Sequence, residues 1–93
     1  MVRPQRHYRV WPRAYRNWEK IDWIPFLLTD VVDAIEALPE SELTVTRSIR
    51  PPVVFQKVRA TVFGFRFEIQ GVRTVDGRWL EVMAVRPMGD EVK

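Results

Sequence analysis

Hydrophobic residues recur at helical spacing in the first part of the chain. The clearest helix has apolar side chains at i, i+3, i+4, i+7, i+11 and i+14, namely Ile24, Leu27, Leu28, Val31, Ile35 and Leu38. Pro39 ends it. A shorter helix is predicted from Pro12, whose missing N–H is not needed in a first turn, and Ala14, Trp18 and Ile21 form its apolar side. The alternation over residues 7–11 predicts a short strand before it. Two helices so close in sequence should form a helical hairpin.

The second part of the chain alternates between apolar and polar positions, as strands do. The predicted strands are Leu43 to Ile49, Val53 to Val62, a segment alternating at Phe65, Phe67 and Ile69, and Trp79 to Val85. Pro51-Pro52 interrupts the series and Asp76-Gly77 is typical of a hairpin turn. The chain, residues 1–93, therefore predicts a single α+β domain. In it, an N-terminal strand and a two-helix hairpin pack on an antiparallel sheet of about four strands.

Composition removes several classes of function. The 93 residues are 46% hydrophobic and 29% charged, which is a globular balance. Cysteine is absent, which excludes disulfides and thiolate zinc sites. A single histidine, His7, excludes a multi-histidine metal centre and the usual catalytic triads. No apolar run reaches the roughly 20 residues of a membrane span, and no secretory signal follows the arginine-rich start. We expect a cytoplasmic protein with no membrane, metal or cofactor.

Charge is sorted along the chain. Residues 1–18 carry +5, residues 19–42 carry −6 and residues 43–93 carry +4, and twelve of the fifteen basic residues are arginine. Arginine is a forked, permanently charged ligand for phosphate. The asymmetry indicates a phosphate-bearing partner such as nucleic acid, although a solvated surface rich in arginine would give the same composition.

Four basic residues of the strand-rich half are candidates for an anion site: Lys57, Arg59, Arg66 and Arg86. Lys57 and Arg59 are two apart, so a strand places both on one face. Neighbouring strands could bring all four together, or leave them scattered over a solvent face. Arg86 has the parity of the apolar Val82 and Ala84, so it joins the others only if it lies beyond the core or a bulge turns it.

Carboxylates and aromatic residues of the same region have two interpretations each. Glu68 and Glu81 could act as general bases, but a single carboxylate on a basic sheet is more often an ion-pair partner. Most aromatic side chains are expected in the core: Trp18, Trp23, Phe26, Phe63, Phe65 and Phe67. Trp11 and Trp79, which adjoin basic residues, are the better candidates to stack on a base.

Two segments resemble the RelE-type toxins, the ribosome-dependent mRNA interferases of the RelE/ParE superfamily. Arg13-Ala14-Tyr15-Arg16-Asn17-Trp18-Glu19-Lys20-Ile21 is similar to that family's R-A-L-K-E-W-x-K-L helix. Lys57-x-Arg59-x₄-Gly64-Phe65-Arg66 is similar to its K-x-K-x₄-G-Y-R strand pair, and Arg86 follows at the spacing of its next arginine. The resemblance spans most of the chain and agrees with the predicted order of elements.

The resemblance implies cleavage of mRNA in the ribosome, with the RNA's own 2′-OH attacking the adjacent phosphate. Lys57 would be the base or its electrostatic helper, Arg59 and Arg66 would hold the scissile phosphate, and Arg86 would stabilise the transition state or leaving group. A base role needs a lysine pKa well below about 10.4, which nearby arginines favour. Further RNA contacts are expected from Arg13, Arg16, Lys20, Phe65 and Trp79. The implied partners are the ribosome, mRNA and a cognate antitoxin.

The chain departs from the family pattern at three places. Val92 stands where the family often has a C-terminal acid–base residue, Arg59 replaces a lysine, and Leu43 to Pro52 forms an added strand and turn. A gyrase-directed branch of the superfamily shares the fold without the nuclease residues. A gyrase-directed toxin and a catalytically silent RNA-binding or inhibitor module of the same fold therefore remain alternatives.

Overall fold

The structure, a computed structural model, describes residues 7–50 and 53–89. Two α-helices and five strands follow in chain order, with a short 3-10 helix between the helices and the last four strands. Their bounds are β1 Arg9–Val10, α1 Pro12–Glu19, α2 Leu28–Glu36, the 3-10 helix Glu40–Glu42, β2 Thr44–Arg50, β3 Val53–Val62, β4 Phe65–Arg73 and β5 Trp79–Pro87. The predicted α+β class is confirmed.

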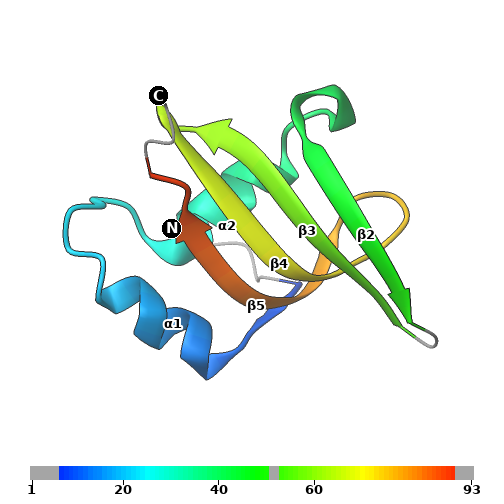
Figure 1. Cartoon of the computed structure of the whole chain (residues 1–93), viewed down its shortest axis with the longest axis horizontal. Helices are drawn as coiled ribbons and strands as arrows, with labels where there is room; N and C mark the ends of the chain where they lie inside the picture. The colour runs from blue at the N-terminus through cyan, green and yellow to red at the C-terminus, as the bar shows by residue number, and fades with distance from the viewer. Residues whose placement is uncertain (1–6, 51–52, 90–93) are drawn as a thin grey trace, which may run out of the picture.

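The five strands form one mixed sheet in the order β1-β5-β4-β3-β2. The last four strands pair antiparallel, as predicted, whereas the two-residue β1 runs parallel to β5. The strand expected over Leu43 to Ile49 is the edge strand β2, and the N-terminal strand β1 joins the opposite edge of the four antiparallel strands as a fifth strand. Figure 1 shows α2 crossing behind the strands and α1 lying beside β5.

Both helices pack on the same face of the sheet. Alternate side chains of the central strands point to them, and Val58, Ile69 and Val85, which pair across β3, β4 and β5, are almost completely buried. Val31, Val32 and Ile35 of α2 are equally buried against this face. Burial of this apolar layer is the main force that holds the two layers together.

The opposite face, which no described helix covers, is called the open face. Its side chains include Thr44, Thr46, Lys57, Arg59, Thr61, Arg66, Glu68, Gln70, Ala84 and Arg86, as the strand register shows.

The second helix is shorter than its apolar periodicity predicts. It begins at Leu28 rather than Ile24 and ends at Glu36. Pro25 explains why Ile24 is not helical, because the residue before a proline is disfavoured in helical conformation, and the helix begins only after Leu27, whose backbone is extended. The linker is instead held by the Trp18 indole, whose Nε1 donates to the carbonyl oxygen of Phe26 at 3.0 Å.

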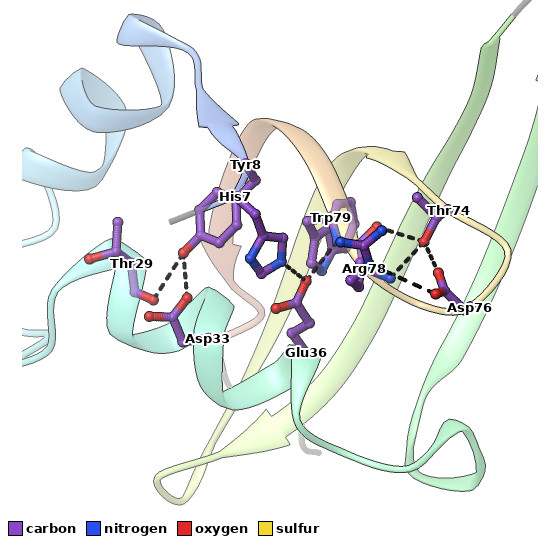
Figure 2. A network of polar contacts seen from close by, with 9 residues as sticks. All are labelled: His7, Tyr8, Thr29, Asp33, Glu36, Thr74, Asp76, Arg78 and Trp79. Atoms are coloured by element: carbon purple, nitrogen blue, oxygen red, sulfur yellow. Dashed lines mark hydrogen bonds and ion pairs between the residues drawn. The ribbon is translucent and has the colours of Figure 1, made fainter. Parts of the chain in front are cut away.

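Helix α2 is tied by side-chain hydrogen bonds to the beginnings of the parallel strands β1 and β5 (Figure 2). The Glu36 carboxylate accepts from the backbone N–H of Trp79 at 2.7 Å and lies 3.0 Å from Nε2 of His7. One turn earlier, the Tyr8 hydroxyl donates to Asp33 at 2.6 Å. These contacts fix the first described residues and the start of β5 on the same helix.

Candidate functional site on the open face

The four predicted cations lie on one face of the sheet. Arg59 on β3 pairs with Glu68 on β4, which pairs with Arg86 on β5, and residues that pair across neighbouring strands share a face. Lys57 is two residues from Arg59 on β3, and Arg66 is two residues from Glu68 on β4. All four basic side chains are exposed. The open face therefore gathers them on three adjacent strands.

A β-bulge turns Arg86 to this face. Gln70 of β4 pairs with Ala84 of β5, but the next residue, Gly71, pairs with Val82, so Met83 has no partner of its own. One extra residue reverses the alternation of the strand. Val82 and Val85 can therefore both be buried while Ala84 and Arg86 lie on the open face. Of the two explanations for the parity of Arg86, the bulge is the one found.

A buried carboxylate lies between two of the cations. Glu68 Oε1 is 3.1 Å from Nε of Arg59, and Oε2 is 3.4 Å from Nε of Arg86. The Gln70 side-chain amide donates to Oε2 at 2.7 Å. The Glu68 side chain is 0% exposed, whereas those of Arg59 and Arg86 are 45% and 60% exposed. Glu68 is thus an ion-pair partner, the more frequent of the two interpretations given to it from sequence.

The environment of Glu68 keeps it ionised. Burial alone would raise its pKa, but the hydrogen bonds from Gln70 and Arg59 and the positive charge of Arg86 outweigh burial and lower the pKa below its ordinary value of 4.5. At neutral pH the row of Arg59, Glu68 and Arg86 therefore carries two positive charges and one negative charge.

The other two cations are held more loosely. The guanidinium of Arg66 makes two long contacts of 3.5 Å, to the hydroxyl oxygens of Thr61 and Thr44. Within residues 7–50 and 53–89, the Lys57 ammonium has no recorded hydrogen bond or ion pair. Its register partners are Thr46 and Gln70. The face therefore combines two fixed guanidinium groups with a weakly held arginine and a lysine that can move.

The predicted stacking residues are not on this face. Trp79 is completely buried, so the prediction that it stacks on a base is wrong. The Arg73 guanidinium lies 5.8 Å from the centre of its ring. Phe65 points to the helix side, where its ring contacts those of Trp23, Phe26 and Phe67.

The aromatic core prediction holds only in part. Trp18 and Phe67 are buried, and Phe26 and Phe65 are partly buried against the core. Trp23 is 54% exposed and Phe63 is 49% exposed, because the linker and the β3–β4 turn that carry them lie at the rim of the core. They were assigned to the core by residue type alone, which does not distinguish the rim from the interior.

The basic residues of α1 remain separate from the four cations. Arg13, Arg16 and Lys20 are exposed on or just after a helix that packs on the other side of the sheet. The Arg13 guanidinium lies 5.7 Å from the centre of the Trp11 ring and makes a cation–π contact with it. An RNA strand bound to the open face would have to extend around the edge of the sheet beside β5 to reach α1.

Sequence reasoning missed two residues that shape the site, Gln70 and Gly71, and one buried arginine on the opposite side of the sheet, Arg73. Gln70 holds the Glu68 carboxylate, and its place two residues along the same strand was the available signal. Arg73 is a buried arginine on the helix side, bonded to Gln56 at 3.1 Å and Glu40 at 3.2 Å. Gly71 permits the bulge and gave no signal, because a lone glycine in a strand has many explanations.

The chemistry available on the open face is that of anion binding. Guanidinium and ammonium groups donate hydrogen bonds to phosphate oxygens, and they stabilise the negative charge that develops on those oxygens during phosphoryl transfer. Among the described residues, no group of three His, Asp or Glu side chains is placed to bind a metal ion. No described helix is long and apolar enough to cross a membrane.

Comparison with known proteins found no matching protein family, no matching curated protein and no matching solved structure.

Proposed function

We propose that the open face binds the backbone of RNA and that the protein is a RelE-type endoribonuclease, the cytoplasmic toxin of a toxin–antitoxin pair. One observation carries the proposal: Lys57, Arg59, Arg66 and Arg86, the residues that the sequence resemblance singles out, lie on the same face of the sheet. A face with four cations around a single buried carboxylate is suited to a polyanion.

In the proposed reaction, Lys57 takes the proton of the ribose 2′-OH or assists its loss. The 2′ oxygen then attacks the adjacent phosphorus, and the bond from phosphorus to the 5′ oxygen breaks. The products are a cyclic phosphate and a 5′-OH, whose oxygen takes a proton from water, while Lys57 later returns its proton to water. Arg59 and Arg66 hold the phosphate oxygens, and Arg86 stabilises the charge that accumulates as the bond breaks.

The partners follow from the same surface. The mRNA would be met in the ribosome, where the strand is held extended for attack. A cognate antitoxin that inhibits the protein would cover the basic open face, for which an acidic or amphipathic segment has complementary charge.

The test is cleavage of mRNA in a reconstituted translation reaction. We expect the wild-type protein to give fragments with a cyclic phosphate end, and a 2′-deoxy substitution at the cut site to abolish cleavage there. The double variant Lys57→Arg with Arg86→Lys keeps the total charge, so it should lose cleavage and keep RNA affinity within about threefold. Cleavage of the 2′-deoxy RNA, or an unchanged rate in the double variant, would refute the mechanism.

A second candidate is an RNA-binding module without catalysis. It is favoured by the pairing of Arg59 and Arg86 with Glu68, which fixes them in place and suits binding as well as it suits catalysis. RNA binding without fragments in the same reaction would select this function. Toxicity on expression that survives both Arg66→Ala and Arg86→Ala would instead favour a gyrase-directed toxin.

A further inference from the structure

The row of Arg59, Glu68 and Arg86 has a feature that phosphate binding alone does not require. Each oxygen of the Glu68 carboxylate takes one arginine, Oε1 at 3.1 Å from Arg59 and Oε2 at 3.4 Å from Arg86. Both contacts use the Nε atom of the arginine; the contact to Arg59 is a hydrogen bond, whereas the contact to Arg86 is an ion pair. The two guanidinium groups, which come from strands on either side of β4, are therefore held by a single carboxyl group.

The contacts through Nε leave the outer edges of both guanidinium groups available. A guanidinium has five N–H donors in a plane: one terminal N–H lies on the same edge as Nε–H, and the other three point away from that edge. No contact of these terminal nitrogens with another described residue is recorded for Arg59 or Arg86. Both side chains remain about half exposed, so those donors can reach a ligand on the open face.

The charges of the row match one phosphodiester. Two guanidinium groups and one carboxylate leave a single positive charge, and the phosphodiester group of RNA carries a single negative charge. Without the carboxylate, the two arginines would repel each other before RNA arrives. With the carboxylate buried beneath them, the two guanidinium groups can lie close together in the RNA-free protein, in the geometry that a phosphate needs.

Stability alone gives a weak reason for this arrangement. A buried ion pair is often no more stabilising than apolar residues of similar volume, because desolvation of the charges offsets their attraction. Gln70 adds a further donor to Oε2 at 2.7 Å, which limits the rotation of the carboxylate. The ion pairs of Glu68 and its hydrogen bond from Gln70 therefore fix the position of the arginines more than they increase the free energy of unfolding.

We infer that Glu68 is a positioning residue, which holds Arg59 and Arg86 by their Nε atoms so that their terminal nitrogens form a clamp for one phosphodiester group of RNA. The inference rests on the proposed function for the identity of its ligand. It adds a residue that does not touch the RNA and assigns a role to the carboxylate in an otherwise basic face.

The variant Glu68→Gln tests the clamp, with Glu81→Gln as the matched control. Glu81 lies on the same face and pairs with Val72 on β4. Its replacement by glutamine removes the same charge, and Glu81 does not contact either arginine. In Glu68→Gln the NH2 group of the amide replaces one carboxylate oxygen. Because this group is a donor, it cannot accept from an arginine Nε–H, and one arginine is released. We expect the maximal cleavage rate to fall at least about tenfold in Glu68→Gln while RNA affinity stays equal or rises, and neither quantity to change more than about twofold in Glu81→Gln. Equal rates in the two variants would overturn the inference.

A measurement by nuclear magnetic resonance separates the clamp from the nuclease. In the wild-type protein, the Nε–Hε signal of Arg59 should be protected from exchange, because it is hydrogen-bonded to Glu68. The Nε–Hε signals of Arg59 and Arg86 should both shift when a 2′-O-methyl RNA, which cannot be cleaved, is added. In Glu68→Gln the Arg59 signal should lose protection, or one of the two RNA-induced shifts should weaken. Protected and RNA-sensitive signals in a protein that does not cleave RNA would support the clamp and reject the nuclease, whereas signals unchanged by Glu68→Gln would reject the clamp.

The variant Arg86→Lys covers the case in which Glu68→Gln does not fold. Arg86 is 60% exposed, so its replacement leaves the core intact. A lysine keeps the positive charge. Its single ammonium nitrogen, however, cannot contact Glu68 through one nitrogen and the phosphate through others, as a guanidinium can. Protection of the Arg59 signal should remain, because Oε1 still binds it, while the RNA-induced shift should weaken. An RNA-induced shift of full size in this variant would contradict a clamp made of two arginines.

Discussion

Gly71 is the position where one added methyl group should disturb the fold most. A Cβ atom at this residue would overlap the carbonyl oxygen of Glu81 and lie 3.0 Å from its carbon and 3.1 Å from Cα of Val82. All three atoms belong to the backbone of β5. No side-chain rotation can relieve the overlap, so Gly71→Ala must push the two paired strands apart.

The cost can be bounded from known overpacking effects. Extra groups in a well-packed interior cost about 1–3 kcal/mol when side chains can yield. Here only backbone can yield, so we expect about 3 kcal/mol, a large part of the roughly 5–14 kcal/mol available to a chain of this length. For a domain of this size, each kcal/mol lowers the melting temperature by about 4–8 °C. Gly71→Ala should therefore melt about 12–24 °C below the wild-type protein.

The assay is thermal unfolding followed by near-ultraviolet circular dichroism, with Gly64→Ala as the control. Trp79 is a suitable probe, because it is buried and pairs with Arg73 two residues from the substitution. A Cβ at Gly64 meets no atom within 4 Å, and the only penalty is its left-handed backbone with φ of +82°, about 1 kcal/mol. If Gly71→Ala proves no less stable than Gly64→Ala, the close approach of β4 to β5, and with it the bulge that turns Arg86, is wrong.

Three further predictions concern pH, packing and salt. The pKa of Glu68 is lowered in the folded protein, so its contribution to stability is present above pH 4.5 and is lost as the pH falls through the folded value; urea titrations from pH 6 to pH 3 should show a steeper loss in the wild-type protein than in Glu68→Gln. Ile35→Ala empties a site in α2 that is 1% exposed and should lower the free energy of unfolding by about 3 kcal/mol in urea, whereas a loss under 1 kcal/mol would contradict the packing of α2 on the sheet. Arg66→Ala should reduce the slope of log affinity for single-stranded RNA against log salt by about 0.7, and an unchanged slope would place Arg66 outside the RNA contact.

Most of the sheet could be predicted from the sequence because its signal is local. Side chains alternate with a period of two, and the strands from Val53 to Val62 and from Phe65 onward show that alternation clearly. The same period places Lys57 with Arg59, and Arg66 with Glu68, on shared faces. The start of α2 was predicted too early because apolar periodicity was weighed above the restriction that Pro25 imposes on the residue before it.

The side-chain directions along β5 could not be predicted, because they depend on contacts with β4. Register shifts leave Leu80 and Met83 without partners, and each reverses the alternation. The first shift turns Trp79 into the core, although the neighbouring Arg78 had indicated an exposed site. The second turns Arg86 to the open face. Both depend on how closely the backbones of the two strands approach, which the identity of the β5 residues does not encode.

The two kinds of cation on the open face suit different parts of the proposed reaction. A phosphate must be bound in one orientation before attack, and the two arginines held by Glu68 are already fixed by a buried group. A proton carrier must approach and leave an oxygen, and Lys57 has an exposed side chain on a flexible stem. Lys57→Arg should therefore lower the cleavage rate with little effect on affinity, since an arginine keeps the charge but does not give up its proton. A proportional loss of rate and affinity in this variant would mean that Lys57 is one more phosphate ligand and that the proton is carried by another group.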